Sequence, residues 1–168
     1  LMRRRYDTAL FAQKIEKVKT TMPDAFIGVD VIVGTRGETD ACFEEAYRFI
    51  EGLDISQLHV FSYSERPGTK ALEIPHVVAP EVKHERSQRL LALSEQKRTD
   101  FYRTHIGQVR PVLWEHSKAG QPLQGFTDNY IRVQAAPQLA VQDNCIAPVR
   151  LGDFAEQGEG APLTGLEI

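Results

Sequence analysis

The spacing of apolar residues predicts that the chain begins with helices and strands in alternation. Apolar side chains recur at helical spacing over residues 11–22, which is the stripe of an amphipathic helix capped by Asp7 or Thr8. A second stripe predicts a helix over residues 40–51, and a short apolar run predicts a strand over residues 57–62. Helices that alternate with strands in this way are typical of parallel βα units.

A dense apolar run lies between the two predicted helices. Seven of the eight residues from Phe26 to Val33 are apolar or glycine, and Asp30 is the exception. Such a run predicts a parallel strand that is covered on both faces. Because a sheet of two parallel strands is marginal by itself, we expect this part of the chain to be cut from a larger sheet, with one edge that needs a partner.

This strand runs into a glycine-rich loop, GTRGE, at residues 34–38. The two glycines permit tight backbone geometry, and ligands bind at the carboxyl ends of parallel strands. The alternative is a plain strand-to-helix turn, with Thr39 or Asp40 as the helix cap. A phosphate-binding loop is disfavoured because the GK[ST] ending is absent. The candidate ligand contacts are therefore the polar residues of the loop: Thr35, Arg36 and Glu38.

The second half of the chain changes character twice. Residues 80–108 follow a helical pattern that opens at a proline, with six Lys or Arg against four Asp or Glu. That charged face is either simply solvated or contacts RNA. Residues 109–154 are short β-like runs separated by turn residues, which predict a small β-barrel. We expect residues 155–168 to be a flexible tail.

Composition and charge exclude several classes of protein. The 168 residues are 42% hydrophobic and 26% charged, as in globular proteins, and the formal net charge of −3 argues against nucleic-acid binding by bulk charge alone. The two cysteines, Cys42 and Cys145, are far apart and form neither a disulfide framework nor a metal ligand set. Because no disulfide framework is present, a reducing cytoplasm is the expected location. No apolar run approaches the length of a membrane span.

Four segments, taken in order, resemble a known family: MRRRYDTALF at Met2, GVDVIVGTRGET at Gly28, HVFSYSERPGTKA at His59 and GFTDNYIRVQ at Gly125. They are similar to the carboxy-terminal part of a radical S-adenosylmethionine (radical SAM) methylthiotransferase. The resemblance implies an α/β part of a radical SAM barrel in residues 1–79 and a linking helix in residues 80–108. It implies a TRAM domain, a small OB-like β-barrel that holds tRNA, in residues 109–154.

The family carries two 4Fe-4S clusters, one on a CxxxCxxC loop and one on three further cysteines, and this chain has neither set. We therefore expect no catalytic and no metal-binding residue here, no activity of the chain alone, and cluster domains in an amino-terminal part of the same polypeptide. The resemblance implies that the adenine of S-adenosylmethionine meets Val33, Gly34 and Thr35. Glu38 either bonds a ribose or amine or favours the next helix. Thr35 and Arg36 stand where the family usually has Phe and Pro.

The same resemblance implies tRNA, at its anticodon arm, as substrate. Arg66 before Pro67 is similar to the tRNA-acting branches, and the wording GVDVIVG and HVFSYS favours threonylcarbamoyladenosine over isopentenyladenosine as the modified base. Asp30 either contacts the substrate from the barrel lumen or forms a structural ion pair. Two alternatives remain: a non-catalytic RNA-binding module with an α/β appendage, and a methylthiotransferase that acts on a ribosomal protein.

The predicted β-barrel supplies the remaining candidate RNA contacts. Aromatic rings at Phe126 and Tyr130 could stack on bases, and three cations could meet phosphates. Trp114 is expected in the barrel core. Four bases and four acids cancel over residues 109–154, so RNA binding should be modest and sensitive to salt. The three cations are Arg110, Lys118 and Arg132.

Overall fold

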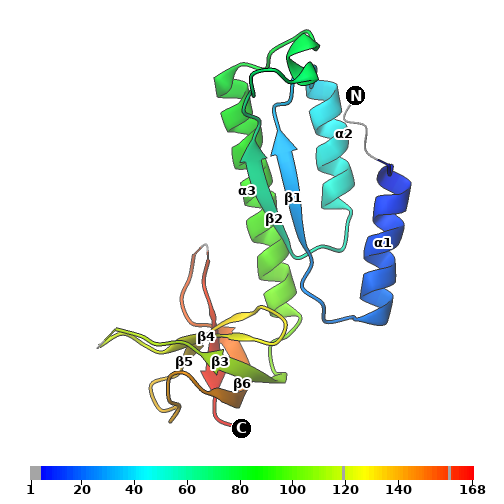
Figure 1. The fold of residues 1–168 in the computed structure, drawn as a ribbon. Coiled ribbons are helices and arrows are strands. Elements are labelled where there is room, and N and C mark those ends of the chain that lie inside the picture. Colours follow the sequence, from blue (N-terminus) through cyan, green and yellow to red (C-terminus); the bar gives the residue numbers. More distant parts are fainter. Residues whose placement is uncertain (1–4, 119, 159) are drawn as a thin grey trace. The chain divides into compact units, whose positions relative to one another are not determined.

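A computed structural model describes residues 5–118, 120–158 and 160–168. The chain divides into two compact units, and the boundary between them along the chain falls between Lys97 and Arg98. Met2 to Arg4 of the first family-like segment and Glu159 of the expected tail lie outside the described residues. The elements, in chain order (Figure 1), are α1 (Thr8–Thr21), β1 (Gly28–Val33), α2 (Asp40–Glu51), β2 (Gln57–Ser62), η1 (Lys70–Glu73), α3 (Pro80–Arg103), β3 (Val109–Trp114), β4 (Gln124–Thr127), β5 (Arg132–Ala135), β6 (Ile146–Phe154) and β7 (Leu163–Leu166).

Local capping chemistry fixes where the first two helices begin. The Asp7 carboxylate accepts a hydrogen bond from the Leu10 amide at 2.8 Å, and the Thr39 hydroxyl accepts one from the Cys42 amide at 3.2 Å. Both capping residues are among those predicted from the sequence. The described helices include none that is long and apolar enough to cross a membrane.

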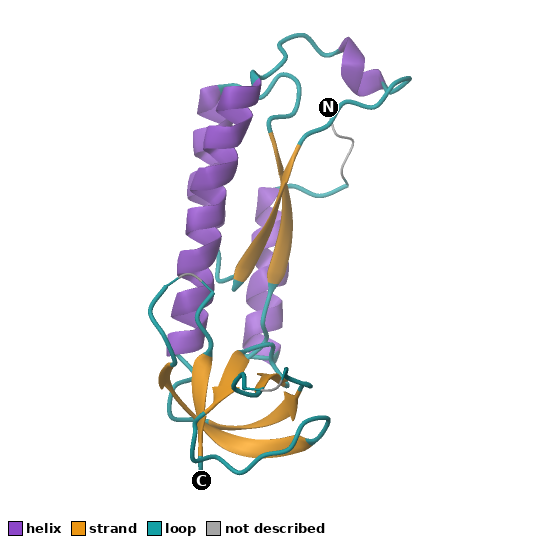
Figure 2. Cartoon of the chain, turned by 90° about the vertical axis from the view of Figure 1, so that its left-hand side faces the viewer, coloured by secondary structure: helices purple, strands orange, loops and turns teal. Residues whose placement is uncertain are grey.

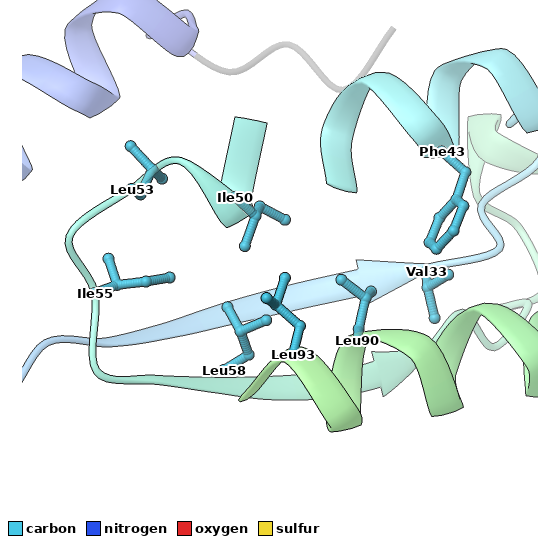
Figure 3. Close-up of a cluster of buried hydrophobic side chains, with 8 residues drawn as sticks. All are labelled: Val33, Phe43, Ile50, Leu53, Ile55, Leu58, Leu90 and Leu93. Carbon is cyan, nitrogen blue, oxygen red and sulfur yellow. The ribbon is translucent and has the colours of Figure 1, made fainter. Parts of the chain in front are cut away.

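Strands β1 and β2 of the first unit form a two-stranded parallel sheet, in register from Gly28 opposite Gln57 to Val33 opposite Ser62. Eight buried side chains from both strands, α2, α3 and the α2–β2 connection meet in one core (Figure 3). The Ser94 hydroxyl of α3 accepts from the Leu58 amide at 2.8 Å and donates to the Leu58 carbonyl at 3.0 Å. At Leu58, therefore, α3 satisfies the edge of β2 that faces away from β1.

The opposite face of this sheet is open. Val33 is buried, whereas Asp30 and Ile32 are exposed, and so are their partners across the sheet, His59 and Phe61. The expectation that residues 26–33 are covered on both faces is therefore wrong for this chain. Right-handed crossovers place the helices on one side of a parallel sheet, so the described residues supply no layer for the other side.

The second unit is built of β-strands, drawn in orange (Figure 2). They form a closed barrel with the strand order β3-β4-β5-β7-β6. Its interior is filled by side chains that are almost fully buried, and Trp114 at 0% exposure is confirmed as core. Strand β7 pairs in parallel with β5 and antiparallel with β6. This differs from the flexible tail expected for residues 155–168, because Leu163 to Leu166 have the pairing partners that order them. The closed barrel is compatible with a TRAM-like or OB-like domain.

Candidate functional site

The loop after β1 is held in one conformation by its glycines and by α3. Gly34 and Gly37 have φ of 77° and 79°, in the left-handed region that favours glycine. A Cβ atom on Gly34 would lie 2.4 Å from Cγ of Lys83, so any other residue there would have to displace the Lys83 side chain of α3. The Val33 side chain points into the core, and its carbonyl accepts from the Tyr63 amide at 2.8 Å. Of the residues expected at the adenine, Val33 and Gly34 are buried and Thr35 is half-buried.

Glu38 lies at the centre of a partly buried polar network. Its Oε1 accepts from the Gly34 amide at 3.0 Å and from Nη1 of Arg86 at 2.6 Å, while Nη2 of Arg86 donates to Asp40 at 2.6 Å. Burial alone would lower the pKa of the Arg86 guanidinium, but its hydrogen bonds to Asp40 and Glu38 raise that pKa above its usual value. Glu38 thus fastens the loop to α3, a role that neither sequence alternative included. Within the described residues, its Oε2 accepts no hydrogen bond.

Hydrogen bonds from Arg36 connect the loop after β1 to the segment after β2. Its Nε donates to Glu65 at 2.7 Å, and its Nη1 donates to the carbonyls of Leu72 and Ile74 at 2.7 and 3.2 Å. The Gly37 amide adds a bond of 2.9 Å to the His76 carbonyl. Arg36, one of the two residues expected to depart from the family pattern, therefore links two loops at the carboxyl ends of neighbouring strands.

Removing this link should change the titration of Glu65. The hydrogen bond from Arg36 holds the pKa of the Glu65 carboxyl below its ordinary value. A carboxyl whose pKa is lower in the folded state than in the unfolded state stabilises the fold at pH values above its unfolded-state pKa. This stabilisation is lost as the pH falls through the folded-state pKa. In Arg36→Ala we expect the pKa of Glu65 to rise toward its ordinary value in a carboxyl NMR titration. Glu44, whose pKa is lowered by its hydrogen bond from Arg89, is the internal control and should not move. An unchanged Glu65 pKa would contradict the link.

The open face of the sheet carries polar residues at the position expected for a barrel lumen. Asp30 faces it, directly opposite His59, and a Cβ atom on Gly28 would lie 3.3 Å from Nε2 of His59. Sequence reasoning missed His59, although alternation along β2 and the parallel register place it beside Asp30. An open groove of about 830 Å³ follows β1 between α1 and α2, and Asp30 lines it. Arg66 is exposed on the loop after β2.

On the barrel, three predicted RNA contacts come together. Phe126 and Arg132 are partners across β4 and β5, and the ring centroids of Phe126 and Tyr130 are 6.0 Å apart. Tyr130 is 70% exposed and has a φ of 66°, unusual for a residue with a side chain. Arg110 pairs with Asp128 at 3.3 Å, so a neighbouring acid offsets its charge. Lys118 is exposed on the β3–β4 connection.

The turn that carries Tyr130 is fixed by buried polar groups. The Thr127 hydroxyl donates to Oδ1 of Asn129 at 2.7 Å and accepts from the Ile131 amide at 2.8 Å. These bonds satisfy the backbone locally and hold Tyr130 outward.

Neither candidate site holds a metal ligand set. Among the described residues, no group of three or more His, Cys, Asp or Glu side chains is placed to bind a metal ion. Cys42 is exposed and Cys145 is half-buried. The donor chemistry of this chain therefore does not fit an iron–sulfur cluster. At the loop after β1, the polar groups that the described residues offer are the Oε2 acceptor of Glu38 and the hydroxyl of Thr35.

The first unit is a parallel βα unit with a structured loop at its strand ends, and the second is a closed five-stranded barrel that is compatible with an OB-like module. No protein-family model matches the chain. It is 38% identical over 136 residues to threonylcarbamoyladenosine tRNA methylthiotransferase MtaB of Bacillus subtilis, covering 79% of this chain and 30% of the relative. It is 37% identical over 154 residues to a tRNA-2-methylthio-N(6)-dimethylallyladenosine synthase of Syntrophotalea carbinolica, covering 89% and 34%.

A third relative, a tRNA-2-methylthio-N(6)-dimethylallyladenosine synthase of Streptomyces griseus, is 34% identical over 171 residues, covering 96% of this chain and 34% of the relative. The chain therefore belongs to the tRNA methylthiotransferase family, and it spans about a third of the length of these relatives.

Proposed function

We propose that this chain is the carboxy-terminal part of a radical SAM enzyme that methylthiolates threonylcarbamoyladenosine next to the anticodon of tRNA. The observation that carries the proposal is the match over 79% of the chain to the B. subtilis threonylcarbamoyladenosine enzyme. The open sheet face, with Asp30 and His59, supports a part of a barrel whose other strands lie elsewhere in the same polypeptide. Isopentenyladenosine is the second candidate substrate, because other relatives are dimethylallyladenosine synthases.

In this proposal the two 4Fe-4S clusters and S-adenosylmethionine supply the radical chemistry when bound, and the clusters are held outside this chain. The residues of this chain bind and orient. The loop from Gly34 to Glu38 would hold the adenosyl group, with Glu38 Oε2 as the acceptor for a ribose hydroxyl or an amine. Asp30, on the open face, meets the substrate base. The described chain carries no candidate for the catalytic radical step, so alone it is inactive.

The barrel and the loop after β2 supply the tRNA contacts. Phe126 and Tyr130 stack on bases, and Arg132, Lys118, Arg110 and Arg66 meet phosphates. Because Arg110 is paired with Asp128, its contribution should be smaller than that of Arg132.

The test is to express the whole polypeptide that contains this chain in a bacterium lacking its own tRNA methylthiotransferases, and to analyse the tRNA nucleosides by mass spectrometry. We expect the methylthio derivative of threonylcarbamoyladenosine. The derivative of isopentenyladenosine alone would select the second substrate. A methylthiolated ribosomal protein, or no product from a folded protein with intact clusters, would refute the proposal.

A further inference from the structure

The open face of the sheet in the first unit carries two rows of side chains that differ in chemistry. Alternation along each strand turns every second residue toward this face, and the register sets Asp30 of β1 beside His59 of β2. One row nearer to the strand ends, Ile32 lies beside Phe61, and these two side chains are 44% and 53% exposed. Adjacent rows lie about 6.6 Å apart along a strand, so a polar pair and an apolar pair form one continuous surface.

A glycine leaves room for the imidazole of His59. Gly28 is two residues before Asp30 on the same face of β1, and a Cβ atom there would lie 3.3 Å from Nε2 and 3.7 Å from Cδ2 of His59. The ring therefore leans over the amino end of β1, at a residue that has no side chain to displace it. An alanine at this position would press on the imidazole, because 3.3 Å is tighter than ordinary van der Waals contact.

The fold of the first unit does not use the polar pair. Within the part of the chain that the structure describes, neither the Asp30 nor the His59 side chain has a hydrogen bond or an ion pair. By contrast, Arg36 and Glu38 at the strand ends are each held by several hydrogen bonds. A carboxylate accepts hydrogen bonds and an imidazole N–H donates one, so the polar pair offers an acceptor and a donor side by side.

The two candidate substrates differ in the group that the adenosine carries on N6. The threonylcarbamoyl group has urea N–H donors, a hydroxyl and a carboxylate, whereas the isopentenyl group is a hydrocarbon. A pair of hydrogen-bonding side chains discriminates strongly between such groups, because the hydrocarbon would cover the pair and leave it without partners. The open face is therefore complementary to the threonylcarbamoyl group.

We infer that His59 selects the threonylcarbamoyl group by donating an N–H to its carboxylate, while Asp30 accepts from its urea N–H or its hydroxyl. Asp30 alone would repel a carboxylate, so the imidazole beside it is the group that admits an anionic substituent. The apolar pair keeps the polar pair one row away from the loop that begins at Gly34, so the substituent lies apart from the adenosyl group that this loop would hold. The inference rests on the proposed function and adds the residue that sets its substrate.

The structure also shows which residue of the HVFSYS segment is placed to meet a substrate. Val60 is half-buried on the other face of the sheet, and the Ser62 hydroxyl lies 3.1 Å from the Ser87 hydroxyl of α3. Phe61 faces the open side but has no hydrogen-bonding group. His59 is therefore the hydrogen-bonding side chain that the part of this segment in β2 turns to the open face.

The test uses the whole polypeptide that contains this chain, expressed in a bacterium that lacks its own tRNA methylthiotransferases and makes both modified adenosines. Mass spectrometry of the tRNA nucleosides gives the ratio of the methylthio derivative of threonylcarbamoyladenosine to that of isopentenyladenosine. We expect His59→Phe to lower this ratio at least about tenfold, which corresponds to about 1.4 kcal/mol. His59→Gln keeps an N–H donor and should lower the ratio less. His84→Phe makes the same change at an exposed position of α3 and should leave the ratio unchanged.

The ratio separates substrate selection from damage to the protein. Loss of folding or of the clusters lowers both products together and does not move the ratio. An unchanged ratio in His59→Phe would overturn the inference while the proposed function stands. A wild-type protein that modifies isopentenyladenosine alone would overturn it as well.

Binding decides the inference if no methylthiolated nucleoside is found, an outcome that refutes the proposed function. Titration calorimetry with the nucleosides threonylcarbamoyladenosine and isopentenyladenosine measures the affinity of the same polypeptide for each. Tighter binding of threonylcarbamoyladenosine, weakened about tenfold by His59→Phe and unchanged by His84→Phe, supports the inference. Binding of threonylcarbamoyladenosine that is no tighter than that of isopentenyladenosine, or that does not depend on His59, overturns it.

Discussion

Replacing Arg86 with alanine will lower the free energy of unfolding of the first unit by about 3 kcal/mol, the lower end of the cost of breaking a buried ion pair. The Arg86 side chain is 5% exposed and that of Glu38 only 15%, so the substitution leaves a shielded carboxylate whose one remaining partner among the described residues is the Gly34 amide. The lower end applies because Asp40, the second partner, is 94% exposed and is solvated when Arg86 is lost.

Urea denaturation followed by far-UV circular dichroism, which reports the helices, measures this loss. Arg86→Lys keeps the positive charge but loses the guanidinium that bonds Glu38 and Asp40 through separate nitrogens, so it should recover only part of the stability. Arg48→Ala, an exposed position on α2, is the matched control and should change the free energy of unfolding by less than about 0.5 kcal/mol. If Arg86→Ala costs no more than Arg48→Ala, the network is not a structural element of this unit.

Gly125→Ala will destabilise the barrel by about 3 kcal/mol, at the upper end of the usual cost of overpacking. Gly125 lies in β4 opposite Trp114, and a Cβ atom there would come within 2.3 Å of the Leu113 carbonyl oxygen and 2.8 Å of Val112 Cγ1. The first of these contacts is with backbone, so relief requires β3 and β4 to move apart.

The single tryptophan lies in the barrel core, so its fluorescence during urea denaturation reports this unit. Gly120→Ala is the matched control. It has no atom within 4 Å of the added methyl group and a φ of 83°, so its cost is only the left-handed backbone penalty of about 1 kcal/mol. Equal effects of the two substitutions would show that the β3–β4 pair relaxes freely.

Features encoded by neighbouring residues could be predicted from the sequence. The caps at Asp7 and Thr39 are visible because the capping side chain and the amide that it satisfies lie within three residues. The prediction that β1 is covered on both faces is wrong because Ile32 is apolar but exposed. An apolar residue at this exposed position hides the alternation of exposed and more buried side chains along the strand. A single apolar residue on the open face was enough to mimic a strand buried on both sides.

Features that depend on distant partners could not be predicted. Arg36 reaches Glu65, which is 29 residues away, and two carbonyls that are 36 and 38 residues away, and nothing in the local pattern predicts those acceptors. Phe126, Tyr130 and Arg132 were proposed from the family resemblance, whereas Leu113, Ile146 and Arg150 join them only through strand register. Register is set by strand pairing, and a shift of one residue would turn these outward side chains toward the core.

The insertion of β7 between β5 and β6 imposes an order on the biosynthesis of the barrel. Strands β6, β3, β4 and β5 can pair as a four-stranded antiparallel sheet, but the edges of β5 and β6 stay bare until Leu163–Leu166 is available. On the ribosome, closure must wait until translation has passed Leu166 and that segment has left the exit tunnel. A nascent chain that stalls before then presents two unpaired strand edges to other chains, which is the condition that favours aggregation and chaperone capture.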